Sequence, residues 1–413
     1  MVSNAQRLIC EQCGRGIEEE NFQLNCPDCR TTLRVQYDLK KLKRDFAALD
    51  DRLFSGSFLR NYQNFLPIKQ PDLIDRVSLN EGQTPLIPSH RLKKELGITD
   101  LLFKIESHGP TLSLKDRGTS LCALKALELG FDTLCVASSG NNAASVSAYA
   151  ARAGLKAVVF VQRDLSPAKI LKIMAYGPQL VKIDGDMSIA SRLCREMLAR
   201  HHWFECGGPS PYRFTAKRIV AYEVVRQLGG RAPDVMILPV GGGTGMASVY
   251  CGFLELKDMG VISALPRLIG VQFAACAPVA RAYDKNTDVI EPVEKKPCVS
   301  DALLNRTPIA GLQALRAVRE TGGKILTITD EESIAAIRQL GSQEGLFMEP
   351  AGCAALAALK KLVSKGELKG AKTVVCTLTG HGLNAPASAF STSESPEVVP
   401  ADVASVEAYL GLC

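Results

Sequence analysis

A lysine falls where the sequence predicts that a strand ends and a helix begins. Residues 101–105 alternate like a strand, and residues 119–130 repeat Leu, Ala and Cys at helical spacing. Lys115 therefore lies at the predicted helix start, where the positive end of the helix dipole disfavours an ammonium. A lysine that releases its proton is an amine nucleophile, as Schiff-base chemistry requires. The alternative is a solvated lysine beside Asp116 and Arg117, and this stretch alone leaves both open.

Two pairs of cysteines near the N-terminus have the spacing of metal ligands. Cys10 and Cys13 are separated by twelve residues from Cys26 and Cys29. Four thiolates at this spacing can converge on one tetrahedral ion, so a structural zinc ribbon is favoured over four metal-free thiols. A catalytic metal is disfavoured because four protein ligands leave no open position. Zinc ribbons also occur in proteins that bind nucleic acid, so the module alone permits that class.

The rest of the chain predicts the elements that would position this chemistry. Short apolar strands alternate with helices of about a dozen residues, which predicts an α/β fold with parallel sheets covered on both faces. The predicted strands are 101–106, 133–137, 157–161, 179–183, 235–240, 268–272 and 373–378. The predicted helices are 119–130, 142–153, 167–175, 214–228, 246–256, 331–344 and 351–362, with 40–53 helical in part.

Three turns after these strands carry small, polar or glycine residues. Ligands of open parallel sheets bind beyond the carboxyl ends of the strands. The turn 138–142 (Ser-Ser-Gly-Asn-Asn) can surround a carboxylate, and the turn 241–245 (Gly-Gly-Gly-Thr-Gly) lets backbone N–H groups approach a phosphate. The turn 379–382 (Thr-Gly-His-Gly) follows the last strand. Each turn alone is weak evidence, but their joint placement indicates one binding site.

Together these motifs resemble a known family. The cysteine module, residues 81–86 (Glu-Gly-Gln-Thr-Pro-Leu), residues 110–118 around Lys115 and the three turns occur in the order of the threonine synthase branch of the fold-type II pyridoxal-phosphate enzymes. The resemblance spans residues 8 to about 386. It implies two doubly wound, mostly parallel-sheet α/β domains with the cofactor in the cleft between them, plus the zinc-ribbon-like module.

The resemblance also implies roles for single residues. Lys115 is the catalytic residue and the lysine bonded to pyridoxal 5'-phosphate, Asn141 contacts the 3-oxygen, and the Thr379 hydroxyl contacts the pyridine nitrogen. The cofactor phosphate is expected at Gly241, Gly242, Gly243, Thr244 and Gly245. A hydroxyl at the pyridine nitrogen does not hold it protonated, which suits elimination and replacement at the β-carbon. Once freed, Lys115 can serve as general base and then as acid.

The domains are predicted at residues 1–36 for the zinc-ribbon-like module and 121–212 for a small α/β domain. Residues 37–120 and 213–413 are predicted to form a large α/β domain with an N-terminal extension. We also expect a homo-oligomer.

Departures from the usual threonine synthase motifs narrow the predicted reaction and substrate. Leu112 and Leu114 replace a glycine and a phenylalanine, Ser139 and Asn142 replace two threonines, and the phosphate loop lacks the usual asparagine. This pattern is similar to the cysteate synthases of coenzyme M biosynthesis in methanogens, which convert O-phospho-L-serine and sulfite to L-cysteate and phosphate. The alternatives are a threonine synthase acting on O-phosphohomoserine, a cysteine synthase and a serine/threonine deaminase. From another class, a zinc-ribbon binding protein or amino-acid sensor on a degenerate enzyme scaffold stays open.

Both substrates of the cysteate reaction are anions, so nearby cations are candidates to bind them. The candidates are Lys104, Arg117, Lys217 and Arg218, with His108 as a further donor, although a solvated surface charge is the commoner role. His381 is expected near the cofactor without a catalytic role. Cys353 and Cys376 lie in apolar runs and are expected in the core.

The amino-acid composition limits which other functional classes the protein can belong to. The 413 residues carry a formal charge of +6 without basic runs, so a nucleic-acid partner is not implied. The sequence shows neither a signal peptide nor an apolar stretch long enough to span a bilayer, and most of its 14 cysteines stand alone in apolar surroundings. We therefore expect a cytoplasmic protein in a reducing compartment that acts on a small anionic amino acid and sulfite, without a membrane partner.

Overall fold

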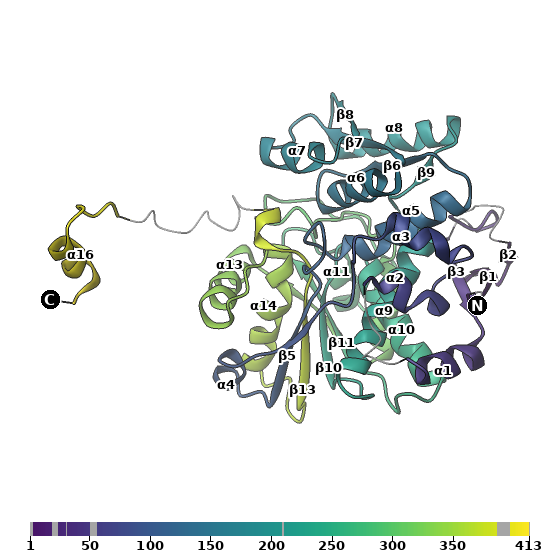
Figure 1. The fold of residues 1–413 in the computed structure, drawn as a ribbon. Coiled ribbons are helices and arrows are strands. Elements are labelled where there is room, and N and C mark those ends of the chain that lie inside the picture. Colours follow the sequence, from purple (N-terminus) through teal and green to yellow (C-terminus); the bar gives the residue numbers. More distant parts are fainter. Residues whose placement is uncertain are drawn as a thin grey trace.

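The protein contains three sheets, which Figure 1 shows within the main body. The computed structural model describes residues 3–18, 24–29, 31–49, 56–208, 210–385 and 397–412. Two of the sheets are mostly or wholly parallel and are flanked by helices, and the third is a small antiparallel sheet near the N-terminus. The predicted α/β fold class is confirmed.

The larger sheet has six strands in the order β12-β11-β10-β13-β5-β4. All neighbours are parallel except β4, which runs antiparallel to β5 at the edge. Its central strands are continuous runs of buried apolar residues, as expected for a sheet covered on both faces. The strands are β4 Leu86–Pro88, β5 Asp100–Ile105, β10 Val235–Pro239, β11 Arg267–Phe273, β12 Lys324–Ile328 and β13 Thr373–Leu378.

The smaller parallel sheet has four strands in the order β8-β7-β6-β9. They are β6 Thr133–Ala137, β7 Lys156–Gln162, β8 Gln179–Ile183 and β9 Phe204–Glu205. Its helices α6 Asn141–Ala153, α7 Pro167–Met174 and α8 Met187–Arg200 lie beside it at the top of Figure 1. The carboxyl end of β6 leads directly into the turn 138–142 and then into α6.

Two helices lie deep between the parallel sheets. α5 Lys115–Glu128 and α9 Pro211–Gln227 contact each other and are buried along most of their length. The other helices that cover the larger sheet are α10 Thr244–Asp258, α11 Pro278–Asp284, α12 Gly311–Glu320, α13 Asp330–Gln339 and α14 Pro350–Ser364. The helix predicted at 331–344 ends as a π-helical turn, Leu340–Glu344. The sequence analysis did not predict α8, α11, α12 or β12.

Several short helical elements lie before, within and after the segments that form the larger sheet. They are α1 Leu39–Ala47, α2 Phe58–Asn61, α3 Ile74–Val77 and α4 Leu92–Glu95, with 3₁₀ turns at Gln63–Phe65, Pro71–Leu73 and Gly382–Asn384. The helical stretch predicted at 40–53 is α1, and residues 50–53 lie outside the described residues. The C-terminal helix α16 Val403–Leu410 stands apart from the main body in Figure 1, with exposed apolar side chains.

The N-terminal sheet is antiparallel, in the order β2-β1-β3. Its strands are β1 Ala5–Cys10, β2 Gly16–Ile17 and β3 Leu33–Tyr37. It has its own small core around Leu8 and Leu33, and β3 packs against α9, where the Arg218 guanidinium lies 4.0 Å from the centre of the Tyr37 ring. The exact domain boundaries, 1–36, 121–212 and 37–120 with 213–413, stay a prediction. Within the described part of the chain, no helix has the length and apolar character needed to span a membrane.

Candidate active site

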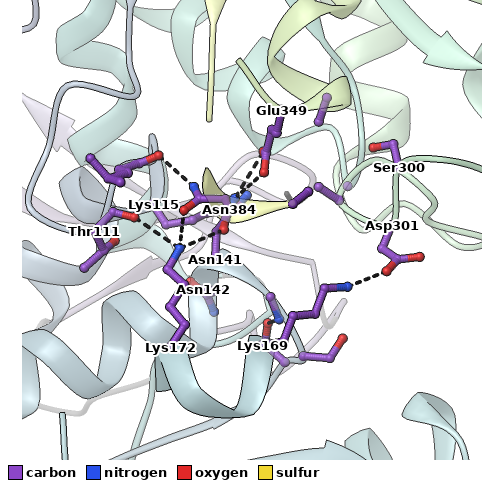
Figure 2. A pocket seen from close by; sticks show the side chains of 18 of the residues that line it. Thr111, Lys115, Asn141, Asn142, Lys169, Lys172, Ser300, Asp301, Glu349 and Asn384 are labelled. Carbon is purple, nitrogen blue, oxygen red and sulfur yellow. Dashed lines mark hydrogen bonds and ion pairs between the residues drawn. The ribbon is translucent and has the colours of Figure 1, made fainter. Parts of the chain in front are cut away.

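A cavity of about 750 Å³ lies between the two parallel sheets. Its wall includes Lys115, the turn 138–142 after β6, and Gly242 and Thr244 after β10. Figure 2 shows Lys115, Asn141 and Glu349 around this cavity. Three sequence motifs that are far apart along the chain therefore meet at one place.

The segment around Lys115 is held by hydrogen bonds to two other parts of the chain. The Asp116 carboxylate accepts from the Thr111 N–H (2.9 Å) and from the Ser145 hydroxyl of α6 (2.8 Å). The Leu114 N–H donates to the carbonyl of Thr379, which follows β13 (3.0 Å). The first turn of α5 is thus fixed relative to α6 and to the segment after β13, which fixes Lys115 in turn.

The ammonium of Lys115 is easier to deprotonate than an ordinary lysine. Its pKa is lowered to about 8, mainly by burial and then by the nearby positive charge of Arg213, while Glu349 opposes this shift. An amine with such a pKa has a much larger neutral, nucleophilic fraction near neutral pH than an ordinary lysine. The sequence analysis attributed this property to the helix dipole, whereas the structure shows burial as the main cause.

Two further cations come from one face of α9. Arg213 and Lys217 are one helical turn apart, and both line the cavity. The Lys217 ammonium lies 3.1 Å from the Thr244 hydroxyl, and Arg213 donates to the side-chain oxygen of Asn142 (2.9 Å). The Arg213 Nε is buried without a hydrogen-bond partner, and burial followed by Arg213 holds the pKa of Lys217 well below its usual range. No carboxylate pairs with either cation in the described structure, so this end of the cavity favours an anion.

The glycine loop after β10 has a backbone that a ligand in the cavity can approach closely. Gly243 has φ 86°, and a Cβ there would overlap the carbonyl of Ala310. Helix α10 begins at Thr244, so unpaired amides of its first turn lie at this end of the cavity. The glycines of this loop, a helix N-terminus and the ammonium of Lys217 together have the chemistry that suits a phosphate.

Asn141 is held between two charged residues that the sequence analysis did not identify. Its side-chain Nδ2 donates to both carboxylate oxygens of Glu349 (3.1 and 3.2 Å), and its Oδ1 accepts from Lys172 (3.3 Å). Lys172 also donates to the side-chain oxygen of Asn384, as Figure 2 shows. Burial raises the pKa of Glu349. The Glu349-Pro350 pair ahead of α14 and the lysine in α7 carried no recognisable motif.

Comparison with known proteins agrees with this geometry. A family model described as pyridoxal-phosphate dependent enzyme matches residues 77–380. The chain belongs to this family. The threonine synthase of Methanosarcina acetivorans is 33% identical over 98% of each chain, and that of Methanocaldococcus jannaschii is 32% identical over 95% of this chain and 96% of its own. A fungal L-serine ammonia-lyase from Rhizomucor miehei shares the fold, with a TM-score of 0.66 and 22% identity over 75% of this chain and 97% of that structure.

Pyridoxal phosphate, the cofactor of this family, fits the cavity. The glycine loop and Lys217 suit its phosphate, and the buried amine of Lys115 suits its aldehyde. Asn141 lies in the same cavity wall, with its side-chain amide bonded to Glu349 and Lys172. The requirements of the cofactor are therefore met by residues of this chain's own cavity.

The predicted cofactor residues do not all reach the cavity surface. The described cavity wall includes Lys115, Asn141, Gly242 and Thr244. Gly241, Gly243 and Gly245 form the backbone of the same loop, and Thr379 is joined to the turn before Lys115 through its carbonyl without being part of the wall. The placement of the Thr379 hydroxyl at a pyridine nitrogen stays a prediction.

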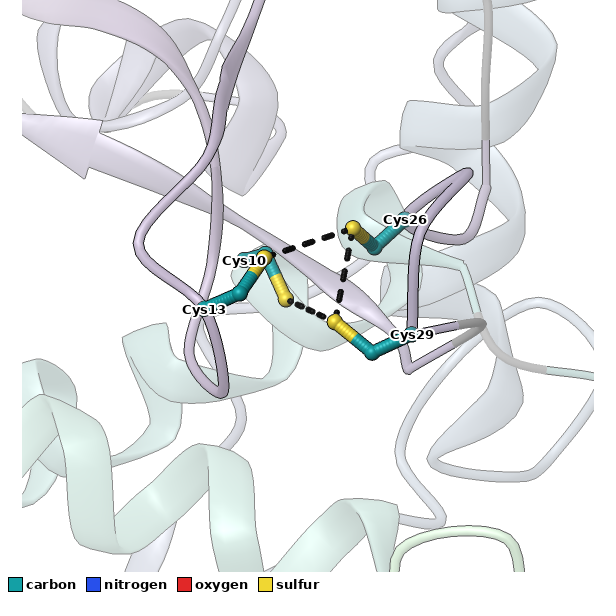
Figure 3. Close-up of side chains that lie close together, drawn as sticks. All are labelled: Cys10, Cys13, Cys26 and Cys29. Atoms are coloured by element: carbon teal, nitrogen blue, oxygen red, sulfur yellow. Dashed lines mark hydrogen bonds between the residues drawn. The ribbon is translucent and has the colours of Figure 1, made fainter.

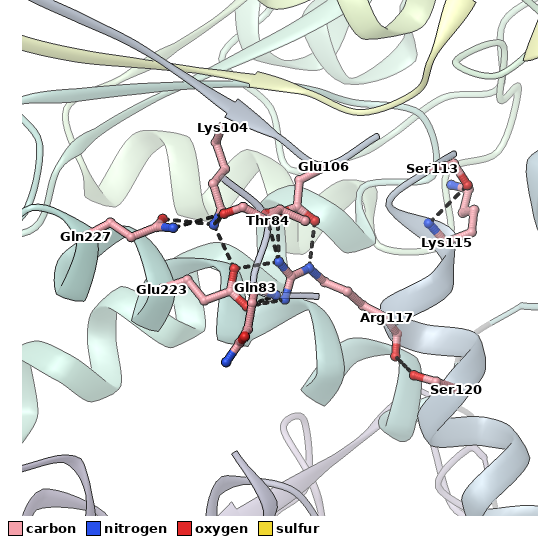
Figure 4. A network of polar contacts seen from close by, with 10 residues as sticks. All are labelled: Gln83, Thr84, Lys104, Glu106, Ser113, Lys115, Arg117, Ser120, Glu223 and Gln227. Atoms are coloured by element: carbon pink, nitrogen blue, oxygen red, sulfur yellow. Dashed lines mark hydrogen bonds and ion pairs between the residues drawn. The ribbon is translucent and has the colours of Figure 1, made fainter. Parts of the chain in front are cut away.

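Most of the cations proposed to receive anionic substrates lie elsewhere. Lys104 and Arg117 are fully buried in an ion network with Glu106 and Glu223, shown in Figure 4. Arg117 donates to both carboxylates at 2.6 Å, and Lys104 lies 2.7 Å from Glu223. They are neither solvated surface charges nor part of the cavity wall. Of the four candidate cations only Lys217 lines the cavity.

The remaining candidate residues lie outside the cavity wall. Arg218 is buried and paired with Glu255, and His108 is exposed outside the cavity wall. His381 packs edge-on against Phe347, with ring centres 5.6 Å apart. Burial, followed by the charge of Lys172, lowers the pKa of His381. Cys353 and Cys376 are fully buried in the core, as predicted.

The four N-terminal cysteines converge, as Figure 3 shows. All four sulfur atoms lie within 4.8 Å of one another. Cys10 and Cys29 are 3.4 Å apart, Cys26 and Cys29 3.6 Å, and Cys13 and Cys26 3.7 Å. The sulfurs of a tetrahedral zinc site are about 3.8 Å apart. The cluster therefore has the size and donor set of a structural zinc site.

Proposed function

We propose that this protein catalyses pyridoxal-phosphate-dependent β-replacement, in which O-phospho-L-serine and sulfite give L-cysteate and phosphate. The supporting observation is the unpaired positive charge of Arg213 and Lys217 beside the glycine loop. Two cations on one helix, the buried Lys217 and the half-buried Arg213, exceed what the phosphate of one cofactor needs. The additional positive charge suits a reaction in which one dianion, phosphate, leaves and another, sulfite, enters.

The proposed roles follow from the cavity. Lys115 holds the cofactor, Asn141 contacts its 3-oxygen, residues 241–245 hold its phosphate, and Thr379 contacts its ring nitrogen. Bound pyridoxal phosphate withdraws electrons from the α-carbon of the amino acid. Lys115 lies in the same cavity and, when not bonded to the cofactor, would take the α-proton in its neutral form.

The atoms of the proposed reaction balance. The bond between the β-carbon and the phosphate oxygen breaks, and phosphate leaves with the electron pair. Sulfite then forms the carbon–sulfur bond with its sulfur lone pair, and Lys115 returns the proton to the α-carbon. Arg213, the cation left over once Lys217 serves the cofactor phosphate, is proposed to hold the departing phosphate and then the incoming sulfite.

Threonine synthase activity on O-phosphohomoserine is the second candidate. It is supported by relatives named threonine synthase that are 32% and 33% identical over nearly the whole chain. Both reactions release phosphate, so the cations of α9 suit either. Cysteine synthase and serine/threonine deaminase reactions use the same cofactor chemistry but require fewer cations.

Product analysis tests the proposal. The holoenzyme is incubated with O-phospho-L-serine with and without sulfite, and separately with O-phosphohomoserine. We expect phosphate release and L-cysteate in the first mixture. Threonine from O-phosphohomoserine, with no cysteate from phosphoserine, would support the second candidate instead.

We also propose that Cys10, Cys13, Cys26 and Cys29 bind a structural zinc ion. The observation that supports this is the convergence of the four sulfurs to within 4.8 Å. Metal analysis of the purified protein is expected to give one zinc per chain, and Cys26→Ser should lose it. A stoichiometry far below one in protein purified without chelator would contradict the proposal.

A further inference from the structure

Leu112 has a backbone conformation that leucine seldom adopts. Its φ is 61°, in the left-handed region. The other described non-glycine residues with positive φ are Asn80, Gln83 and Asn286. Asparagine tolerates this region, but a large side chain does so only at a cost in free energy. Of these four residues, Leu112 alone lines the active-site cavity.

Hydrogen bonds account for the backbone conformation. The Leu112 carbonyl accepts from the His381 N–H (3.1 Å) and from the Asn384 side chain (2.8 Å), and its N–H donates to Gly109 (2.9 Å). These bonds attach the loop before Lys115 to the segment after β13. Glycine would make the same three bonds without strain. The bonds therefore explain the positive φ but not the leucine side chain.

The side chain lies in the wall of the cavity, three residues before Lys115. Leu112 is half-buried, and its neighbours in the wall include the polar residues Thr111 and Asn384. A strained residue that persists at such a place points to a function of its side chain. An isobutyl group here removes space from the cavity that holds the amino acid.

We propose that Leu112 limits the length of the amino-acid substrate, so that a three-carbon O-phosphorylated amino acid is accepted and a four-carbon one is excluded. This inference rests on the proposed function and names the residue that separates its two candidates. Phosphoserine and phosphohomoserine differ by one methylene group. A tight apolar wall discriminates against one extra methylene by about 10- to 200-fold.

Two substitutions separate side-chain volume from backbone strain. Leu112→Ala removes the isobutyl group but keeps a Cβ at positive φ, whereas Leu112→Gly removes both. Phosphate release by each holoenzyme is measured with both phosphorylated amino acids, and binding is followed by visible absorbance without sulfite. Both variants should raise kcat/KM for phosphohomoserine relative to phosphoserine at least tenfold. Leu112→Gly should also melt about 1–2 °C above Leu112→Ala.

Two controls match these variants. Leu171→Ala removes an apolar side chain of α7 that is 72% exposed, lies outside the cavity wall and has no positive φ. Asn286→Gly relieves a positive φ outside the cavity wall. Neither should change the ratio of the two kcat/KM values. Leu112→Met, which conserves volume, should keep the preference of the unmodified enzyme.

An unchanged ratio, within twofold, in both Leu112→Ala and Leu112→Gly would overturn the inference. The proposed function fails separately, if the unmodified enzyme makes no cysteate from phosphoserine and sulfite. Even then, absorbance titrations with the two amino acids report which chain length each variant binds. The two proposals therefore fail by different measurements.

Discussion

Two sets of cations differ in how their charge is balanced, one on β5 and α5 and the other on α9. In the ion network, Lys104 and Arg117 are matched by the carboxylates of Glu106 and Glu223. In the cavity, Arg213 and Lys217 have only neutral partners in the described structure. Charges that are balanced within the protein stabilise the fold, whereas unbalanced ones are available to a ligand.

The contrast is sharpest along α5 itself. Lys115 and Arg117 are two residues apart, so their side chains point to different sides of the helix. Lys115 faces the cavity, and burial lowers its pKa to about 8. Arg117 faces Glu106 and Glu223, and although burial alone would lower its pKa, their carboxylates raise it. One helix thus carries a reactive amine and a structural guanidinium side by side.

The largest effect is expected from Lys115→Ala. This change removes the amine that holds the cofactor and moves the α-proton, so activity should fall by a factor on the order of 10³ or more. Borohydride reduction of the holoenzyme followed by peptide mapping should label Lys115 in the unmodified protein only. Labelling of another lysine would move the active site away from α5.

Arg117→Met tests the ion network, in which the buried charges are balanced. It leaves Glu106 and Glu223 buried with only Lys104 to balance them, which should cost about 3–5 kcal/mol of unfolding free energy. Lys217→Met, measured in the apoprotein as the matched control, should cost no stability because it removes an unbalanced buried cation. Urea denaturation followed by circular dichroism measures both. Equal losses in the two variants would mean that the two sets of cations do not differ as described.

Arg213→Met should weaken substrate binding more than it affects the fold. Hydrogen bonds to charged groups contribute about 1.5–3 kcal/mol, so KM for the phosphorylated amino acid should rise about 10- to 150-fold. Arg192→Met, on the exposed face of α8 where Arg192 pairs with Glu196, is the control and should leave KM unchanged. An unchanged KM in Arg213→Met would remove this residue from the anion site.

The helices, the strands and the convergence of the motifs could be predicted from the sequence better than the interaction partners of single side chains. Strand and helix periodicity, with small residues in the turns at 138–142 and 241–245, located the cavity because parallel strands bring their carboxyl ends to one edge. Which cations face it could not be predicted. Lys217 and Arg218 are adjacent in sequence, yet one lines the cavity and the other pairs with Glu255.

The residues that were missed act through long-range contacts. Glu349 lies 208 positions from Asn141, and Lys172 meets Asn384 across 212 positions. Neither has a neighbour in sequence that signals its partner. The conformation of Leu112 likewise depends on hydrogen bonds from residues 381 and 384, which no local pattern reveals.

The smallest expected effect concerns the ionisation of Lys115. Glu349 raises the pKa of this lysine against burial and Arg213, so Glu349→Gln should move it below about 8, while Arg213→Met should move it above. The expected displacement is about one pH unit in each direction. The rate at which the apoprotein takes up pyridoxal phosphate depends on the neutral amine, and its pH profile measures the shift through visible absorbance. Shifts of the same sign in both variants would show that charge balance around Lys115 is not set by these two residues.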